Sequence, residues 1–323
     1  MVQRLGLAAR IDAAVPVFTR HQPYYESDHV LNIAYNVLCG GQTLDDIERR
    51  RQDRVYLDAL GTESIPDPTT AGDFCRRFDA DRIDALMDAL NETRLKVWQR
   101  CSALVQETAR IDGDGTLVPT TGECKEGMDI AYNGVWGYAP LVVSLANTGE
   151  PLFLKNRSGN RPSHEGAIPY FDKAIDLCRR AGFTDILLRG DTDFALTAAF
   201  DRWTDADVRF VFGFDATPTM VAWGASAPPD LYEHLVQRTE RAIATAPRGR
   251  PVNIKDRVVR ARGFKKITTT SEAVVDFEYQ PTRCGRPYRV VALKKNLSVE
   301  RGEQRLFDEI RYFFYITNDR TLS

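Results

Sequence analysis

The sequence predicts an α/β protein in which a helical N-terminal domain precedes a mixed β-sheet with helices. Apolar residues recur at helical spacing up to about residue 105. After Thr108, short apolar runs of strand length alternate with helical segments. With 43% apolar residues in a chain of 323, there is enough apolar material for a real core and for two domains.

Residues 1–105 are expected to form the helical domain. The segment DHVLNIAYNVLCGG ends at a glycine pair, and Thr43 is a helix cap before LDDIERRR, whose acids precede its bases as the helix dipole favours. A long amphipathic helix is predicted in DADRIDALMDALNETRLKVWQR, with an apolar stripe expected to pack: Ile83, Leu86, Met87, Leu90, Val97 and Trp98. We assign DNA binding or dimerisation to this domain as its expected function.

The second part, residues 106–323, reads as strand, hairpin, helix, strand, helix, strand. ARIDGDGTLV is the first strand candidate, and a hairpin signal lies around Asn147-Thr148-Gly149. Ser163 can cap a helix from about Glu165 to Ala181, with Gly182 as its stop. TDILLRGD and DVRFVFGFD are strand candidates on either side of a helix near FALTAAFDRW.

The stretch IDGDGTLV fits two kinds of phosphate chemistry. It has the spelling of the nucleophile motif of a haloacid-dehalogenase-like phosphatase, which would use Asp112, and also that of the first metal-binding carboxylate of an RNase H-like transposase. In the phosphatases this strand belongs to a parallel sheet and leads into a helical segment, whereas here a hairpin follows. The RNase H fold has three antiparallel strands, a helix and a fourth strand parallel to the first. The element order therefore favours an RNase H-like mixed sheet, with the phosphatase as an alternative.

Two aspartates are expected to meet at one metal site. Asp112 and Asp114 share one face of the first strand because side chains alternate along a strand. Asp191 lies just past the apolar run 186–188, where the fourth strand would bring it beside the first. The spacing of Asp114 and Asp191 suits a shared metal site, and Asp112 and Asp193 are near neighbours that could be mistaken for them.

Positive charge is concentrated late in the chain. The net charge is −2, but residues 248–311 hold 16 Lys and Arg against 8 Asp and Glu. Five of these are candidates for lining a DNA groove, with a plain solvated face as the alternative: Arg257, Arg260, Arg262, Lys265 and Lys266.

Other side chains received weaker assignments. Tyr132, Trp136 and Tyr138 are expected to pack as an aromatic patch, with stacking on a flipped base as the alternative. His164 is expected in a solvated loop near a helix start. Arg189 is expected to pair with Asp191 or to touch DNA.

Targeting and redox signals are absent from the sequence. No run of about 18 apolar residues and no signal peptide is visible, so a cytoplasmic, nucleoid-associated protein is expected. The six cysteines include no C-x-x-C pair, which argues against a zinc site or a disulfide framework.

Long stretches of the chain resemble a DDE-class bacterial insertion-sequence transposase, most closely insertion-sequence family 1380. They include PYYESDHVLNIAYNVLCGGQTLDDIERRR, IPDPTTAGDFCRRF, GYAPLVVSLANTGEPLFLKNRSGNRPSHEGA, ILLRGDTDF and LFDEIRYFFYITND. The resemblance implies a triad of two aspartates and a glutamate holding two Mg²⁺ (or Mn²⁺) ions, with Asp114 and Asp191 as the aspartates. It also implies double-stranded DNA as the partner, a homodimer in the active complex, and a β-rich insertion at about 215–305.

The resemblance places the catalytic glutamate on a helix after RYFFYITND, but the sequence ends at Ser323. Glu300, Glu303 and Glu309 precede that strand, so no third catalytic glutamate is found in the chain and the catalytic domain is expected to be C-terminally incomplete. The leading expectation is a transposase that cuts element ends and joins 3′-hydroxyls to target DNA. The alternative is a catalytically inactive DNA-binding or dimerising fragment.

Overall fold

The computed structural model describes residues 2–19, 23–122, 125–232, 267–268, 271–296, 299–300, 303–304 and 310–321. The chain divides into two compact units. The first comprises Met1–Gln106 with Arg180–Gly182, and the second comprises Glu107–Arg179 and Phe183–Ser323. The five basic candidates between 257 and 266 lie outside the described residues.

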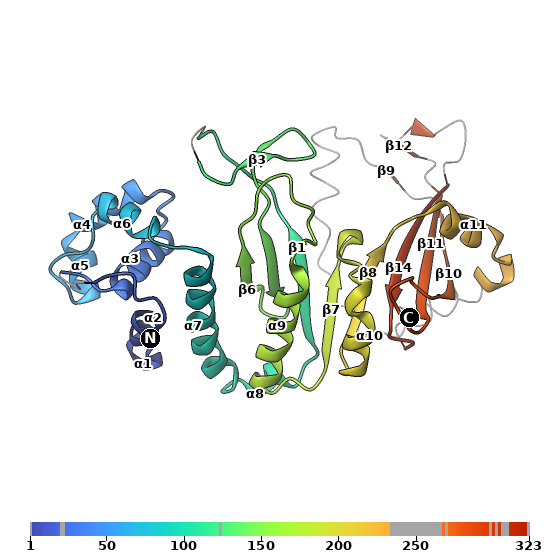
Figure 1. Ribbon diagram of the computed structural model, residues 1–323, viewed down its shortest axis with the longest axis horizontal. Helices are drawn as coiled ribbons and strands as arrows, with labels where there is room; N and C mark the ends of the chain where they lie inside the picture. Colours follow the sequence, from blue (N-terminus) through green and yellow to red (C-terminus); the bar gives the residue numbers. More distant parts are fainter. Residues whose placement is uncertain are drawn as a thin grey trace. The chain divides into compact units, whose positions relative to one another are not determined.

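The first unit is helical in its described residues (Figure 1). Several helices start at an aspartate whose carboxylate accepts a backbone N–H three residues on, as at Asp53, Asp67 and Asp79. The elements are α1 (Val2–Leu5), α2 (Leu7–Ala14), α3 (Glu26–Leu38), η1 (Leu44–Asp46), α4 (Ile47–Arg51), α5 (Arg54–Leu60), α6 (Pro68–Cys75), α7 (Ala80–Trp98) and α8 (Ser102–Val105).

Helix α3 buries polar side chains rather than an apolar stripe. The Glu26 carboxylate is fully buried and accepts hydrogen bonds from the backbone N–H groups of Val17 and Phe18, at 3.0 and 2.9 Å. The Asn32 side chain donates to the carbonyl of Pro66 at 3.0 Å. Because each of these groups satisfies backbone atoms of another segment, α3 fixes the loops around it.

The predicted long helix is present as α7, but its apolar stripe packs only in part: Trp98 is buried, and Leu86 and Met87 are half-buried. Ile83, Leu90 and Val97 are 41%, 37% and 46% exposed. The buried positions of α7 are Ala89, Asn91, Thr93, Leu95 and Trp98, and the helix packs against α2. Trp98 of the predicted stripe is therefore packed, together with Leu95 and with small and polar side chains that a count of large apolar residues does not reveal.

The second unit is built on an eight-stranded sheet with the order β10-β11-β14-β8-β7-β1-β5-β6 (Figure 1). Strand β1 is antiparallel to β5, β5 is antiparallel to β6, and β7 is parallel to β1, as the sequence predicted for the first four strands. The elements of this part are β1 (Ala109–Gly115), β5 (Leu141–Leu145), β6 (Glu150–Lys155), α9 (Ala167–Ala181), β7 (Ile186–Gly190), η2 (Thr192–Phe194), α10 (Thr197–Asp205) and β8 (Arg209–Phe214).

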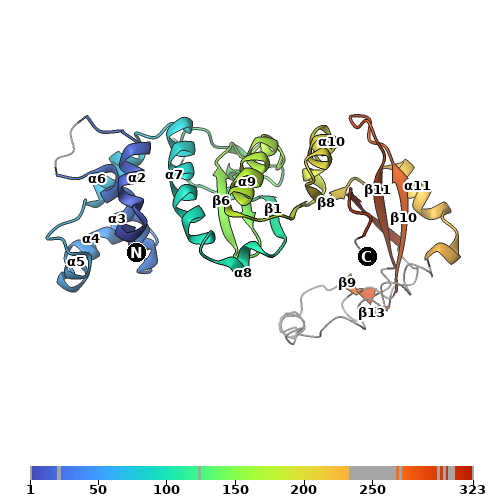
Figure 2. The same ribbon diagram turned by 90° about the horizontal axis from the view of Figure 1, so that it is seen from below.

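The region predicted as a β-rich insertion, about 215–305, contributes to this same sheet. Strand β11 pairs with β14, and β14 pairs with β8, so that β10 and β11 widen the sheet beyond β8. Figure 2 shows α11 beside these strands. The elements are α11 (Pro218–Ser226), β9 (Ile267–Thr268), β10 (Ser271–Tyr279), β11 (Tyr288–Asn296), β12 (Val299–Glu300), β13 (Glu303–Gln304) and β14 (Ile310–Thr317); β9, β12 and β13 form a separate small sheet.

One face of the large sheet carries the core. Phe171 of α9 and Phe200 of α10 contact Phe212 of β8, with ring centroids 6.0 and 5.9 Å apart. Gly224 of α11 approaches Tyr312 of β14 on the same face. Helices α9, α10 and α11 therefore cover this face, and side chains at alternate strand positions point to the other one.

Another small sheet interrupts the connection between β1 and β5. Its strands are β2 (Val118–Pro119), β3 (Asp129–Ile130) and β4 (Trp136–Tyr138), in the order β2-β4-β3. Within the described part of the chain, no helix combines the length and the apolar character needed to cross a membrane.

A charged network joins the strands at the edge where β7 and β8 begin. The Arg209 guanidinium lies between Asp185 and Asp319, donating to Asp185 Oδ1 at 3.0 Å and to Asp319 Oδ2 at 2.6 Å. Thr108, just before β1, donates to Asp185 Oδ2 at 2.6 Å. The network therefore connects the ends of β1, β7, β8 and β14.

The pKa of Asp319 is lowered to about 2 from its ordinary 3.8. Burial of the carboxyl acts to raise this pKa, but hydrogen bonds from Thr321 and Arg209 outweigh burial. A carboxyl with a depressed pKa in the folded state stabilises the fold above its unfolded pKa, and this stabilisation is lost as the pH falls toward the folded pKa.

We therefore expect Asp319→Asn to lower the free energy of unfolding by about 2 kcal/mol at neutral pH. The difference from the unmodified chain should shrink as the pH falls from about 4 to about 2, because the native Asp319 then becomes protonated as well. Urea unfolding at several pH values measures this, with the exposed Asp230→Asn as control. A loss that is the same at every pH would show that packing, and not charge, is responsible.

Candidate active site at the carboxyl edge of the parallel strands

The parallel pairing of β1 and β7 brings Asp114 and Asp191 together. In the register of the two strands, Gly113 lies opposite Gly190, so each aspartate is one step beyond a paired glycine. Both carboxylates are exposed, and both project from the face that α9 does not cover, because Gly113 itself faces Phe171. Two residues far apart in sequence thus form a carboxylate pair at one edge of the sheet.

Glycines allow the close packing beneath this pair. A Cβ atom on Gly113 would lie 2.4 Å from the Phe171 ring, and one on Gly190 would lie 2.6 Å from Cβ of Phe194. A Cβ on Gly213 of β8 would lie 2.6 Å from the backbone nitrogen of Thr192. Cβ atoms in proteins essentially never lie this close to another heavy atom. The turn that carries Asp191 can therefore cross β8 only at a glycine.

Asp112, the neighbouring carboxylate on the same face, is engaged by Arg189. The guanidinium donates to both carboxylate oxygens, from Nε at 2.7 Å and from Nη2 at 2.8 Å. The two residues lie directly opposite each other on β1 and β7. The hydrogen bond to Asp112 raises the pKa of the Arg189 guanidinium.

The Arg189–Asp112 ion pair distinguishes Asp112 from Asp114, and it decides which aspartate pairs with Arg189. Arg189 pairs with Asp112 and not with Asp191. Among the described residues, Asp114 makes no hydrogen bond or ion pair, so its oxygens are free for a ligand. A nucleophilic Asp112, as the phosphatase alternative requires, is disfavoured because its oxygens are held by Arg189 and because β1 has the antiparallel neighbour β5.

Asp191 is in a negatively charged environment. Partial burial raises its pKa, and the charges of Asp193 and Asp114 act in the same direction. The backbone N–H of Asp193, which donates to Asp191 Oδ1 at 3.0 Å, opposes this shift. A bound cation stabilises the ionised form of a carboxyl whose pKa neighbouring carboxylates raise.

A cavity of about 280 Å³ lies between η2, the start of α9 and the end of β8; it borders the turn that follows Asp191, but neither Asp114 nor Asp191 lines it. It is lined by Thr192 and Asp193 from the η2 turn, and by His164, which the sequence placed in a solvated loop. Asp215 and Arg283 add charges of both signs. Sequence reasoning missed Arg283 and Asp215, because only the strand order brings them to this edge.

The donor chemistry of the pair fits a hard divalent cation. Mg²⁺ and Mn²⁺ prefer carboxylate oxygens, and Mg²⁺ keeps several waters, so Asp114 and Asp191 would supply two of its ligands. Over the described residues, no group of three or more His, Cys, Asp or Glu side chains is placed to hold a metal. Glu300 and Glu303 lie on β12 and β13 of the separate small sheet, and Glu309 lies outside the described residues.

The family of the chain is shown by its sequence. The transposase DDE domain group 1 family matches residues 1–307, and the chain therefore belongs to this family of DDE transposases. No curated protein matches the chain.

One similar solved structure is the piggyBac transposase in a synaptic complex with hairpin DNA. It is 11% identical in sequence, with a TM-score of 0.37, and the match covers 98% of this chain. This chain spans 59% of the length of that transposase chain.

Gly213→Ala is expected to displace the turn that carries Asp191, because the new Cβ would collide with backbone atoms that cannot rotate away. The free energy of unfolding should fall by about 1–3 kcal/mol, as for an overpacked core position. Thermal unfolding measures the effect. Gly72→Ala, whose new Cβ would have its nearest neighbours at 3.9 Å, is the control, and equal stability of the two variants would contradict the packing argument.

Proposed function

We propose that this chain is a DNA transposase of an insertion sequence, most similar to insertion-sequence family 1380 and built on an RNase H-like fold. It would cut at the element ends and join 3′-hydroxyls to target DNA by two-metal phosphoryl transfer. The supporting observation is the pairing of Asp114 with Asp191 at the ends of β1 and β7. The family membership gives this carboxylate pair its chemical context.

In this proposal Asp114 and Asp191 hold Mg²⁺ or Mn²⁺. When bound, the ions would supply the Lewis acid that stabilises charge on the attacking and leaving oxygens at phosphorus. The Asp191 carboxylate is oriented by the Asp193 N–H, and its turn is fixed by contact with Gly213. Arg189 neutralises Asp112, which keeps a third negative charge from repelling the DNA phosphate.

The partners proposed are double-stranded DNA at the element ends and target, and a second copy of the chain in the active complex. The helical unit is proposed to bind DNA or to dimerise, and the basic residues between 257 and 266 are proposed DNA contacts. A cytoplasmic, nucleoid-associated location follows as part of the same proposal.

The first test is Mn²⁺ binding followed by electron paramagnetic resonance. Asp114→Asn and Asp191→Asn should each raise the Mn²⁺ dissociation constant by at least about tenfold. Loss of a residue that orients a metal ligand typically weakens metal binding by about tenfold or more, and loss of the ligand itself should weaken it at least as much. Asp230→Asn, an exposed carboxylate outside the site, should leave it unchanged. Metal-dependent cleavage of element-end DNA should be lost in parallel.

Other outcomes separate the alternatives. If only Asp112→Asn abolished metal-dependent phosphate chemistry, the phosphatase alternative would replace this proposal. If DNA bound but none of the aspartate variants changed Mn²⁺ affinity, the chain would be a catalytically inactive DNA-binding protein.

A further inference from the structure

The small sheet between β1 and β5 has one apolar face. Val118 lies opposite Tyr138, and Ile130 lies opposite Trp136. Trp136 and Tyr138 are two residues apart on β4, so all four side chains share one face. Val118, Ile130 and Trp136 are 44%, 45% and 54% exposed, and Tyr132, in the turn after β3, is 96% exposed.

We call Val118, Ile130, Trp136 and Tyr138, with Tyr132, the aromatic face. The expectation that its aromatic residues pack is wrong for Tyr132 and Trp136. Contiguous exposed apolar groups on a soluble protein commonly mark an interaction site.

The aromatic face is held on a fixed support. Gly159, in the loop after β6, donates its N–H to the carbonyl of Gly137 at 3.1 Å, and a Cβ on Gly159 would lie 2.4 Å from the carbonyl oxygen of Asp129. The Asn160 amide donates to the Asp129 carboxylate at 2.6 Å. The Tyr138 hydroxyl donates to the carbonyl of Glu126 at 2.8 Å.

The supporting loop is closed by Arg157. Its guanidinium donates to the carbonyls of Ala139 at 2.9 Å, Pro162 and Ser163 at 3.0 Å, and Glu165 at 2.7 Å. These hydrogen bonds give the Arg157 guanidinium a structural role, so it is not positioned to bind a ligand. Ser163 then rests against Gly115 at the end of β1.

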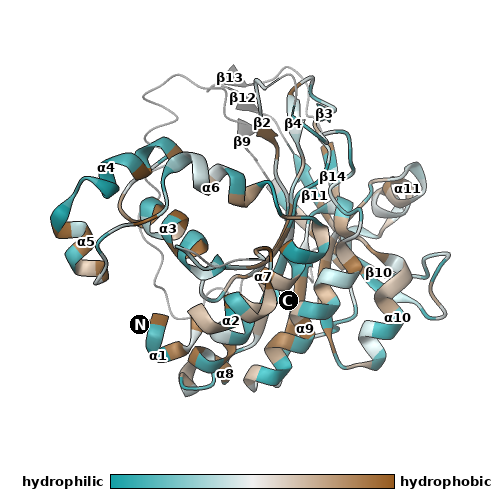
Figure 3. Ribbon diagram, turned by 60° about the vertical axis from the view of Figure 1, so that its left-hand side comes forward, coloured by the Kyte–Doolittle hydropathy of each residue, from teal (hydrophilic) through white to brown (hydrophobic). Residues whose placement is uncertain are grey.

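The aromatic face lies close to the carboxylate pair along the chain. Val118 is four positions after Asp114 in the sequence, so their Cα atoms are at most about 14 Å apart. Figure 1 shows the small sheet beyond the end of β1, and Figure 3 shows β2, β3 and β4 together at that end. Since successive bases of B-DNA are about 3.4 Å apart along the helix axis, this upper limit corresponds to at most about four base steps.

We propose that the aromatic face stacks against unpaired bases of the DNA strand whose phosphate lies at Asp114 and Asp191. This inference rests on the proposed function. Flat aromatic side chains bind the π-faces of all bases, and a rigid support reduces the entropy lost on binding. Asp129 is on the opposite face and is engaged by Asn160, so no strand residue places a carboxylate among the stacking groups.

A second copy of the chain is a less suitable occupant. The three strands contain two, two and three residues. Five partly exposed side chains of this size do not reach the roughly 800 Å² per partner that a stable dimer buries. An exposed tryptophan on β4 and a tyrosine that is 96% exposed in the turn after β3 suit stacking against bases.

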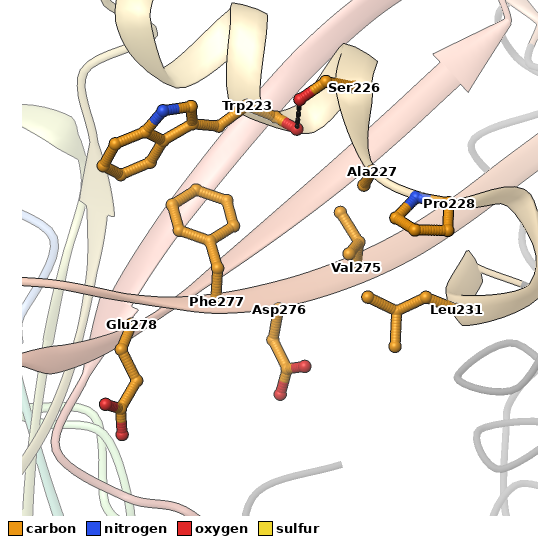
Figure 4. A pocket seen from close by; sticks show the side chains of 9 residues that line it. All are labelled: Trp223, Ser226, Ala227, Pro228, Leu231, Val275, Asp276, Phe277 and Glu278. Atoms are coloured by element: carbon orange, nitrogen blue, oxygen red, sulfur yellow. Dashed lines mark hydrogen bonds between the residues drawn. The ribbon is translucent and has the colours of Figure 1, made fainter.

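Tryptophan fluorescence tests the proposal. Trp98 and Trp203 are buried, so Trp223→Phe leaves Trp136 as the exposed tryptophan of the chain. Trp223 lies over Phe277 and lines a cavity of about 390 Å³ between α11 and β10, away from the aromatic face (Figure 4). In this background, titration with a short oligothymidylate in EDTA should quench the fluorescence and saturate.

Affinity measurements identify the side chain responsible. Trp136→Leu should weaken oligothymidylate binding by about 5- to 100-fold, which is the range for one lost base–aromatic stack. Trp136→Phe, which keeps an aromatic ring, should retain most of the affinity of the unmodified chain. Trp223→Leu is the matched control and should bind normally. Tyr132→Ala should also weaken binding, and it tests the proposal independently if a Trp136 variant does not fold.

Three results would overturn the stacking proposal: no quenching, equal affinities for Trp136→Leu and Trp223→Leu, or self-association that disappears in Trp136→Leu. The last would assign the face to a second copy of the chain. Because the titration is made without metal, it does not depend on metal binding by the carboxylates. Quenching that persists while the aspartate variants leave Mn²⁺ binding unchanged would reject the proposed function and keep a DNA-stacking surface.

Discussion

The parallel pairing of β1 with β7 is the constraint on which the rest of the second unit depends. Its register places Asp112 opposite Arg189 and sets Asp114 beside the position of Asp191. A shift by one residue would turn the carboxylates toward α9 and the apolar side chains outward. The ion pair and the glycine contacts both require the same register, so chemistry and packing select one alignment.

Packing beneath the carboxylates explains why small residues occur at the edge of the sheet. Phe171 and Phe194 approach the backbone of β1 and β7 so closely that no side chain fits at Gly113 or Gly190. Dense packing of this kind leaves little freedom for the backbone, and it holds the exposed carboxylates in place from below. The exposed face can therefore carry polar groups without losing its geometry.

The sequence predicted much of this arrangement because strand and helix periodicities are local signals. The order of β1, β5, β6, α9 and β7 followed from alternation, turn residues and caps, and it was sufficient to bring Asp114 and Asp191 to one edge.

Features that depend on side chains meeting across strands could not be predicted. Which aspartate pairs with Arg189 depends on the register of β1 and β7. The exposure of Trp136 depends on which face of the three-stranded sheet is not covered by other residues. Ile83, Leu90 and Val97 of the predicted α7 stripe are exposed, because apolar spacing does not say which side of a helix has a neighbour. The joining of β10 and β11 to the main sheet depends on pairing between distant segments.

The Arg209 network and the carboxylate pair lie at opposite ends of the same strands. The first joins the residues that begin β7 and β8, and the second follows the end of β1 and β7. Substitutions in the Arg209 network should lower abundance and heat resistance, whereas substitutions of the exposed Asp114 and Asp191 carboxylates should leave stability largely unchanged. A sheet divided in this way lets selection alter the reactive edge while the opposite edge preserves the fold.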